Sequence, residues 1–385
     1  MEGAFINSKI VLLGTQIAIG GAQRLLLGQG RWFYDKGNEV IAIFIYAKSD
    51  LLEDWREQYP FKIINLDAWS STGWNFKNFL KLIRGIFNLF FILLTEKPSM
   101  IETFTTESNI VGIPIAWLAR VPVKVATHHG IVKNYNWRLS LLHRIAINLF
   151  AENLVLVSDH LRRTSINNDK IKPDKLTVIN NGIERPVWNK GPIEIRNEVR
   201  TDLGIGPDDK IVISVGRLSI QKSIDTLLLA APKIIGAEAR TKFVIVGDGG
   251  ESENLVHLSQ SLKVEEHVLF LGERQDAYNL MRAADVYVMT SITEGFPLSL
   301  LEAMIVGLPV VTTDFEGVRD IIEPGENGLI AEIKNPSEVA EKIIRLLENV
   351  ELRKTFSEAN MEKDFSFDEM CLQYQKLFEQ LSSRK

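Results

Sequence analysis

Two glutamates eight positions apart, Glu294 and Glu302, are the residues best suited to bind a polar ligand. Glu294 follows a short apolar run, 286–289, that predicts a buried strand, and Glu302 lies in a helix-like run, 299–306. One carboxylate is therefore expected on a loop and the other about one turn into a helix. A carboxylate there can bind hydroxyl groups, while the N–H groups and dipole of the helix start attract an anion. The pattern indicates a ligand with both parts, such as a nucleotide sugar. A capped helix with two solvated acids is the alternative.

Two cations follow another predicted strand, residues 211–215. Gly216 and Arg217 come directly after this strand, and Lys222 lies five residues further on. Ligands of parallel α/β sheets bind beyond the carboxyl ends of the strands. Arg217 and Lys222 are thus placed to neutralise a diphosphate as its charge develops. Exposed surface charges are the alternative interpretation.

Glycine pairs and histidines mark two further turns. The apolar run 10–13 leads to Gly20 and Gly21 before a helix-like stretch, where glycines let the backbone approach a phosphate. A tight turn explains this pair equally well, and the absence of GxGxxG disfavours a dinucleotide-dependent dehydrogenase. His128 and His129 end the run 123–127, either as structural residues or as ligands of a sugar hydroxyl.

The sequence predicts no metal site and no disulfide framework. It has no Asp-x-Asp pair, no Cys/His cluster with zinc spacing, and a single cysteine, Cys371. The lone cysteine fits a reducing cytoplasm. The first apolar run has the length of a strand, and we expect no signal peptide.

Short apolar runs alternate with helix-length stretches along nearly the whole chain. The predicted strands cover residues 10–13, 40–46, 61–65, 100–103, 123–127, 153–157, 175–179, 211–215, 242–246, 268–271, 286–289, 309–312 and 328–330. This alternation predicts βαβ units, and hence parallel sheets with helices on both faces.

The periodicity lapses at residues 180–192, where glycine and proline cluster. We therefore predict an α/β protein with two facing, doubly wound, Rossmann-like domains and a ligand cleft between them. The first domain is predicted at residues 1–185 and the second at 186–365. The last residues, 366–385, form a helix expected to pack back on the first domain.

Charge is distributed unevenly. Residues 1–190 hold 23 Lys/Arg and 16 Asp/Glu, a balance of +7, and the remainder hold 21 and 33, a balance of −12, which together give the net −5. A basic first half favours an anionic membrane surface or a phosphate-bearing acceptor as partner. The overall negative charge and the lack of a recognised nucleic-acid module argue against nucleic acid.

The segment 75–95 is the most apolar part of the basic half and includes Lys77, Lys81 and Arg84. The most apolar stretch within it, residues 86–94, is far too short for a membrane span. Either a core helix or an interfacial helix explains it.

Six motifs occur in one order, and together they are specific. They are Gly20-Gly21, His128-His129-Gly130, Asn180-Asn181-Gly182-Ile183, Gly216-Arg217 with Lys222, Phe270-Leu271-Gly272, and Glu294-Gly-Phe-Pro with Glu302-Ala. Across essentially the whole chain they resemble the retaining glycosyltransferases of family 4, the group 1 enzymes with a Glu-x7-Glu motif and the GT-B fold.

The resemblance implies a retaining, metal-independent hexosyltransferase without cofactor. It would move a sugar from a nucleotide sugar, with UDP favoured over GDP, to a glycan, lipid-linked or small-molecule acceptor in cell-surface polysaccharide or glycoconjugate synthesis. The first domain would be the acceptor side and the second would bind the donor. Independently of the resemblance, the lone cysteine and the uneven charge lead us to expect a cytoplasmic protein, at the inner face of the membrane where the basic half binds anionic lipid.

The resemblance also implies a role for each matching residue. The catalytic set would be Glu294 on the donor sugar, Arg217 and Lys222 on the diphosphate, and His129 beside the reacting carbon. Further candidates are His128 and Asn181. The donor-binding residues would be Gly20, Gly21, Gly216, Arg274, Phe296, Pro297, Leu298, Ser299 and Glu302.

Three positions depart conservatively from the family pattern. Ser223 replaces the usual glycine, Glu184 an aspartate and Asp320 a glutamate.

Other functions on this fold stay open: a non-catalytic nucleotide-sugar-binding scaffold, a nucleotide-sugar 2-epimerase, or a phosphorylase with lysine-bound pyridoxal phosphate. Acceptor specificity would come from loops of the first domain, residues 47–55, 69–79 and 131–138.

Overall fold

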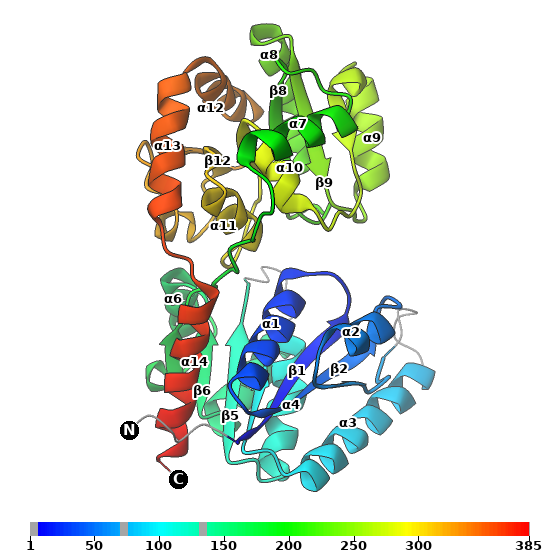
Figure 1. Ribbon diagram of the computed structural model, residues 1–385. Helices are drawn as coiled ribbons and strands as arrows, with labels where there is room; N and C mark the ends of the chain where they lie inside the picture. The colour runs from blue at the N-terminus through cyan, green and yellow to red at the C-terminus, as the bar shows by residue number, and fades with distance from the viewer. Residues whose placement is uncertain (1–6, 70–75, 131–136, 385) are drawn as a thin grey trace. The chain divides into compact units, whose positions relative to one another are not determined.

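The computed structural model describes residues 7–69, 76–130 and 137–384 (Figure 1). The chain divides into two compact units, Met1–Asn181 with Phe367–Lys385, and Gly182–Ser366. Each unit contains one sheet, and every strand pairing within the two sheets is parallel. Two doubly wound α/β domains are therefore confirmed. The first unit ends at Asn181 rather than at the predicted residue 185.

The first unit has a seven-stranded sheet in the order β3-β2-β1-β4-β5-β6-β7. Its strands are β1 (Lys9–Ile17), β2 (Glu39–Ala47), β3 (Lys62–Asn65), β4 (Met100–Thr103), β5 (Val123–His128), β6 (Asn153–Leu156) and β7 (Leu176–Val178). The strand order reverses between β1 and β4, which opens a crevice at the carboxyl edge of such a sheet.

Strand β1 runs four residues beyond its predicted end because Gly14 continues the strand instead of ending it. Gly14 pairs with Phe44, and the ladder continues to Ile17. A Cβ at Gly14 would lie 2.7 Å from the ring of Phe44. The glycine therefore makes room for a buried aromatic side chain.

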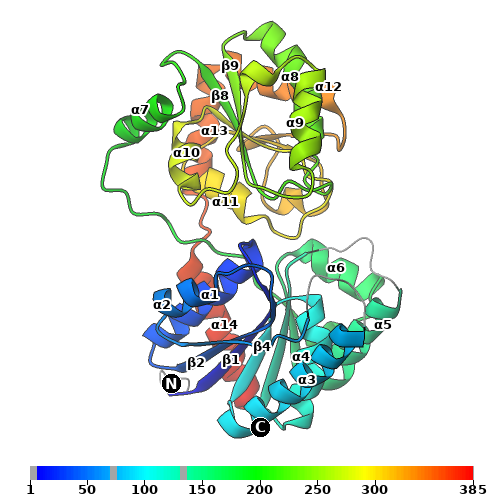
Figure 2. The same ribbon diagram turned by 90° about the vertical axis from the view of Figure 1, so that its right-hand side faces the viewer.

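Helices cover both faces of the first sheet (Figures 1 and 2). They are α1 (Gly21–Asp35), α2 (Leu52–Gln58), α3 (Phe76–Glu96), α4 (Thr106–Leu118), α5 (Trp137–Ile145), α6 (Asp159–Asn167) and α14 (Phe367–Ser382), with short turns η1 (Ala146–Phe150) and η2 (Pro173–Lys175). Successive residues of β1 face opposite layers, because Leu12 contacts Gly30 of α1 and Leu13 contacts Gly112 of α4.

Helix α14, at the end of the chain, belongs to the first unit. The ring of Phe378 lies 5.5 Å from that of Phe33 in α1, and Trp32 Nε1 donates to Asp368 Oδ1 at 2.8 Å. Tyr374 and Phe378 are fully or almost fully buried. The apolar side chains of α14, three and four residues apart, thus form one buried face, and α14 packs beside α1 in the same helical layer.

Helix α3 has one buried face. Asn78, Gly85, Leu89 and Leu93 are buried, and a Cβ at Gly85 would lie 2.2 Å from the Cβ of Ala68. This glycine lets the helix approach the segment after β3. The core-helix interpretation therefore holds for one side of α3 and fails for the other.

The second unit has a six-stranded sheet in the order β10-β9-β8-β11-β12-β13. Its strands are β8 (Lys210–Val215), β9 (Thr241–Val246), β10 (Val268–Phe270), β11 (Val286–Met289), β12 (Val310–Thr313) and β13 (Gly328–Ala331). Its helices are α7 (Pro192–Asp202), α8 (Ile224–Ala237), α9 (Ser252–Ser261), α10 (Ala277–Ala283), α11 (Leu298–Ile305), α12 (Pro336–Glu348) and α13 (Val350–Glu362), with turns η3 (Glu265–His267) and η4 (Val318–Asp320).

The apolar core of the second unit shows which side chains of the central strand β11 point to each face of the sheet. Val286 and Val288 of β11 belong to one apolar cluster with Leu227 of α8 and Ile343 of α12. Tyr287, between the two valines, therefore faces the opposite layer, where α11 lies. The order of the strands again reverses between two neighbours, here β8 and β11.

Candidate functional site

The loops after β8 and β11 meet at this reversal in the second unit. The backbone N–H of Ile292 donates to Gln221 O at 2.8 Å, and Gln221 Nε2 donates to Thr293 O at 2.6 Å. Thr290 Oγ1 also donates to Lys222 O at 3.1 Å. These bonds hold the two loops, which contain the predicted cations and the first glutamate, as one unit.

Lys222 and Glu294 form an ion pair at the junction of these loops. Lys222 Nζ lies 2.7 Å from Glu294 Oε1, with 19% and 10% of the two side chains exposed. Ser291 Oγ donates to the same carboxylate oxygen at 2.6 Å. The fold thus presents an ammonium group and a carboxylate side by side at the carboxyl edge of the sheet.

Glycines make the close packing of this edge possible. Gly216 has φ +156°, and a Cβ there would lie 3.4 Å from Lys222 Cε. Gly247, with φ +128°, and Gly249 approach backbone still more closely, since a Cβ on either would lie 2.1 Å from a carbonyl oxygen. At the predicted donor-binding residue Gly216 the backbone angle favours glycine, and the side chain of Lys222 packs directly beside it.

Helix α11 begins beside the ion pair. Its first residue is Leu298, one position before the predicted start at residue 299. Pro297 directly precedes the helix, and Ser299 lies in its first turn. Glu302 lies one turn further on and is buried, as is Phe296 before the helix. The first N–H groups of a helix have no partner within the helix, so this end is suited to bind an anion.

Tyr287 links these groups and was missed by the sequence analysis. Its hydroxyl donates to Ser299 Oγ at 3.0 Å. Burial raises the pKa of Tyr287 well above its usual value, and the nearby carboxylates of Glu302 and Glu294 raise it further. The signal in the sequence was a phenol in an otherwise aliphatic strand directly before the glutamate motif.

The two predicted arginines lie on different loops. Arg217 is exposed on the same loop as Lys222. Arg274 lies on the loop after β10, two strands from β8, and binds Asp276 through two hydrogen bonds of 2.8 and 2.7 Å. Arg217 therefore shares the loop of the ion pair, whereas Arg274 has a carboxylate partner of its own.

Ser223 and Asp320, two departures from the family pattern, lie in tight turns. Ser223 has φ +48° and precedes α8, a conformation that explains why glycine is usual there. Its hydroxyl donates to Asp225 Oδ1 at 2.8 Å, which offsets part of the cost. Asp320 ends the short turn η4.

The remaining predicted residues lie in the first unit. Gly20 is the last residue before α1, which begins at Gly21. His128 ends β5 and His129 follows, its ring stacked on that of Phe104 at 5.8 Å. Burial lowers the pKa of both histidines to about 4, the neighbouring ring of His128 adds to the effect on His129, and Asn181 opposes it. Both imidazoles are therefore neutral at neutral pH.

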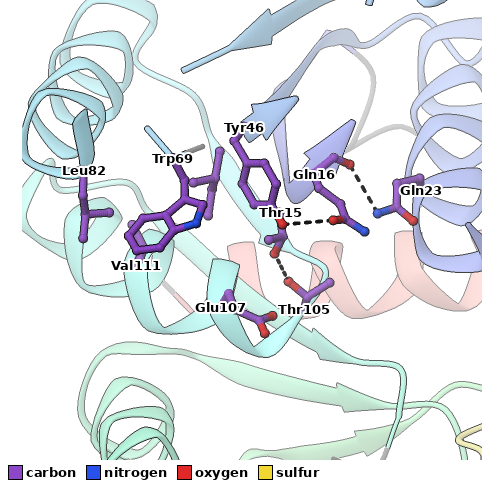
Figure 3. Close-up of a pocket in the computed structure, with 10 residues that line it drawn as sticks. Thr15, Gln16, Gln23, Tyr46, Trp69, Leu82, Thr105, Glu107 and Val111 are labelled. Carbon is purple, nitrogen blue, oxygen red and sulfur yellow. Dashed lines mark hydrogen bonds between the residues drawn. The ribbon is translucent and has the colours of Figure 1, made fainter. Parts of the chain in front are cut away.

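The crevice of the first sheet contains a pocket of about 370 Å³ (Figure 3). Tyr46 and Trp69 line it with the polar groups of Gln16, Gln23 and Glu107. Tyr46 donates its hydroxyl to Gln16 Oε1 at 3.0 Å, and Gln23 Nε2 donates to Gln16 O at 3.3 Å. Aromatic faces beside amides and a carboxylate suit a polar ring or a hydroxyl-bearing ligand.

Of the loops predicted to select the acceptor, Trp69 contributes to this pocket. Residues 70–75 of the same predicted loop, and residues 131–136 of the predicted loop 131–138, lie outside the described residues. Among the described residues, no group of three or more histidine, cysteine, aspartate or glutamate side chains is arranged to hold a metal ion.

Family models match both units. Residues 19–185 match the model for glycosyltransferase family 4, and residues 195–363 match that for glycosyl transferases group 1. The sequence is 28% identical over 282 residues to the UDP-Gal:alpha-D-GlcNAc-diphosphoundecaprenol alpha-1,3-galactosyltransferase of Escherichia coli, covering 70% of this chain and 72% of that enzyme.

Two further comparisons, one of sequence and one of structure, give similar proteins. The sequence is 29% identical over 212 residues to the N-acetyl-alpha-D-glucosaminyl L-malate synthase of Bacillus anthracis, covering 54% of this chain and 55% of that enzyme. The fold is shared with Anabaena HepE, solved in complex with UDP-glucose, with a TM-score of 0.85 at 21% identity over 97% of this chain and 100% of that one.

Proposed function

Because the chain belongs to the family 4 glycosyltransferases and has their GT-B fold, we propose that it transfers a sugar from a UDP-sugar to an acceptor hydroxyl. Relatives whose names or bound ligands include UDP-galactose and UDP-glucose support the choice of UDP. The transfer is proposed to be of a hexose, with retention at the anomeric carbon.

One observation carries the proposal: the Lys222–Glu294 ion pair lies at the carboxyl edge of the second sheet, between the loop after β8 and the loop that leads into α11. A nucleotide sugar needs a cation for its diphosphate and an acceptor group for its sugar hydroxyls, close together. Lys222 and Glu294 supply these 2.7 Å apart. The start of α11 adds N–H groups for phosphate oxygens.

In the proposed reaction, the bond between the anomeric carbon and the diphosphate oxygen breaks, and its electron pair leaves with the diphosphate. Arg217, Lys222 and the N–H groups of Leu298 and Ser299 stabilise the negative charge that develops. The acceptor oxygen bonds to the same face of the sugar, and its proton passes to the departing phosphate oxygen. The protein thus positions the reactants and supplies no covalent nucleophile.

The remaining residues bind and orient the donor in this proposal. Glu294 binds sugar hydroxyls, Glu302 binds the ribose, and the neutral imidazole of His129 contacts the sugar near the reacting carbon. Since the diphosphate charge is met by cations and helix N–H groups, we propose that turnover needs no metal ion.

We further propose that the pocket of the first unit binds the acceptor. Trp69 and Tyr46 offer flat apolar surfaces to a sugar ring, and Glu107 and Gln16 offer hydrogen-bond acceptors to its hydroxyls. The name of the E. coli relative includes a diphosphoundecaprenol-linked sugar, and that of the B. anthracis relative includes malate. We propose a lipid-linked glycan acceptor in cell-surface polysaccharide or glycoconjugate synthesis.

Thermal stability with a panel of UDP- and GDP-sugars, in the presence of EDTA, tests the donor site. We expect one UDP-sugar to raise the Tm, an effect lost in Glu302→Ala and kept in the control Glu358→Ala, whose side chain is exposed on α13. No shift with any nucleotide sugar would contradict donor binding. A shift without release of UDP from any acceptor mixture would favour the scaffold. A shift that requires added Mg²⁺ or Mn²⁺ would overturn metal independence.

A further inference from the structure

The outward side of α3 exposes a row of large apolar side chains. The row, here called the α3 face, consists of Phe76, Leu80, Phe87, Phe91 and Leu94, with Phe79 beside it. Phe87 and Phe91 are 56% and 58% exposed. Because most of the row recurs at intervals of three, four or seven residues, it lies along one side of the helix. Scattered single apolar residues are normal on protein surfaces, but a row of this length marks an interaction site.

Positive charges outnumber negative charges along the α3 face. Lys77 and Lys81 each follow a member of the row by one position, and Arg84 lies between Leu80 and Phe87 along the row. No aspartate or glutamate occurs between Asp67 and Glu96. Lys81 is ion-paired with Asp67 at 2.9 Å, so Lys77 and Arg84 are the cations most available to a partner. The partner that this surface fits is therefore anionic and apolar at once.

The neighbouring helices continue the same composition. Helix α3 packs on α4, and α4 on α5 and the turn η1 (Figure 2). Trp137, Leu142 and Leu149 of α5 and η1 are exposed, and no aspartate or glutamate occurs at residues 108–151. This stretch includes the cations Arg120, Arg138 and Arg144.

We propose that the α3 face, together with Trp137, Leu142 and Leu149, docks on the surface of an anionic lipid bilayer. Aromatic side chains are favoured at the boundary between headgroups and acyl chains, and lysine and arginine are attracted to anionic headgroups. Charge complementarity distinguishes this partner from a second copy of the chain, since two such faces would oppose like charges.

Helix α3 lies on the bilayer and does not cross it. Among the described residues it is the one helix whose length and apolar composition suffice for a span. Its opposite side, however, is buried in the first unit through Leu89 and Leu93, which are 0% and 1% exposed. Crossing would expose that buried face and the sheet beneath it, whereas lying flat buries only the exposed row.

Docking would also bring the pocket of the first unit to the membrane. Leu82 of α3 and Trp69, before α3, line that pocket, so the helix that meets the lipid also forms one wall of the pocket. Membrane binding itself is independent of sugar transfer, and its test does not rest on the proposed function.

Co-sedimentation of the full chain with lipid vesicles tests the proposal. We expect binding to vesicles of phosphatidylglycerol and phosphatidylcholine, weakened by salt, and about tenfold or more weaker binding to phosphatidylcholine alone. The double variant Phe87→Ser/Phe91→Ser should lose about tenfold or more in partition onto anionic vesicles. The matched control Val187→Ser/Ile193→Ser removes two exposed apolar side chains of the second unit and should bind like wild type.

A second pair of variants tests the charges. Lys77→Glu/Arg84→Glu should abolish the preference for anionic vesicles, and Arg345→Glu/Lys354→Glu, which makes the same charge change on exposed sites of α12 and α13, should retain it. Circular dichroism and thermal unfolding establish that each variant is folded. The proposal fails if wild type does not bind anionic vesicles or if the α3 variants bind as tightly as wild type. It also fails if light scattering shows a dimer that the α3 variants dissociate without any vesicle binding.

Discussion

The ammonium group of Lys222 lies 2.7 Å from a carboxylate oxygen of Glu294, on the loop after the neighbouring strand. The two residues are 72 positions apart in the sequence, and Ser291 Oγ donates a hydrogen bond to the same carboxylate oxygen. Each group is mostly buried, so each depends on the other for compensation of its charge. We expect the pair to serve two ends of one substrate.

Replacing Lys222 by alanine should lower kcat/KM with the UDP-sugar by a factor on the order of 10²–10³, because charge on the departing diphosphate loses its stabilising cation. Lys354→Ala, a change at an exposed lysine of the same unit, is the control. Near-normal turnover would remove Lys222 from the site. In urea unfolding, a double-mutant cycle of Lys222→Ala with Glu294→Gln should give a coupling energy of about 1–3 kcal/mol.

Removing the hydroxyl of Tyr287 should affect donor binding more than the fold. Tyr287→Phe deletes the hydrogen bond to Ser299 in the first turn of α11, at a stability cost of about 1 kcal/mol. Because Tyr287 acts through Ser299, we expect KM for the donor to rise several-fold with kcat little changed. Tyr278→Phe, which deletes a bond to Glu184 O elsewhere in the unit, serves as control. Equal kinetics in both variants would make Tyr287 a purely structural residue.

Stability of the first unit should depend on pH through four buried groups. Burial lowers the pKa of His128 and His129 to about 4 and of His143 to about 3, and raises that of Glu102 to about 8. From about pH 4 to 6.5 the unfolded chain binds protons on histidines that the native state leaves neutral, so stability rises with pH. Glu102 acts in the opposite direction from about pH 4.5, because its native carboxyl keeps a proton that the unfolded chain has lost. The three histidines outweigh this one group up to about pH 6.5, and above that pH stability falls until about pH 8.

The variant Glu102→Gln isolates the second limb of this profile. Its stability should stay level between about pH 6.5 and 8, while wild type loses up to about 1.4 kcal/mol per pH unit over the same range. Urea unfolding at several pH values measures the difference. Parallel profiles for the two proteins would show that Glu102 is ionised in the native state at neutral pH.

Two adjacent glycines should respond differently to the same substitution. A Cβ on Gly249 would lie 2.1 Å from the carbonyl oxygen of Leu218, whereas a Cβ on Gly250 would meet nothing within 4 Å. Gly249→Ala should therefore cost roughly 1–3 kcal/mol and raise KM for the donor, since Leu218 lies on the loop of Arg217 and Lys222. Gly250→Ala should be neutral or slightly stabilising. Equal thermal stability of the two variants would contradict the close approach.

The alternation of apolar and amphipathic stretches was sufficient to predict both parallel sheets, because strands of a parallel sheet are buried on both faces and are uniformly apolar. Each predicted strand coincides with an observed one in the described residues. The predicted end of the first strand, at residue 13, was wrong. A glycine that makes room for Phe44 within a strand, as Gly14 does, cannot be told from a turn glycine by sequence. The outward face of α3 was likewise undecided, because a long apolar helix has the same composition whether it is buried or exposed.

The sequence by itself determined the residue types of the site, Glu294, Glu302, Arg217 and Lys222, and their positions just beyond strand ends, since motif and strand are contiguous in the chain. Only the tertiary structure decided which of these residues meet. The reversal of strand order places β8 beside β11, and thus Lys222 beside Glu294 and Arg274 two strands from β8. The tertiary structure also places the hydroxyl of Tyr287 against Ser299, and it brings Tyr46, Trp69 and Glu107 together around one pocket. Strand order is fixed by packing between segments far apart in the chain, and no local pattern encodes it.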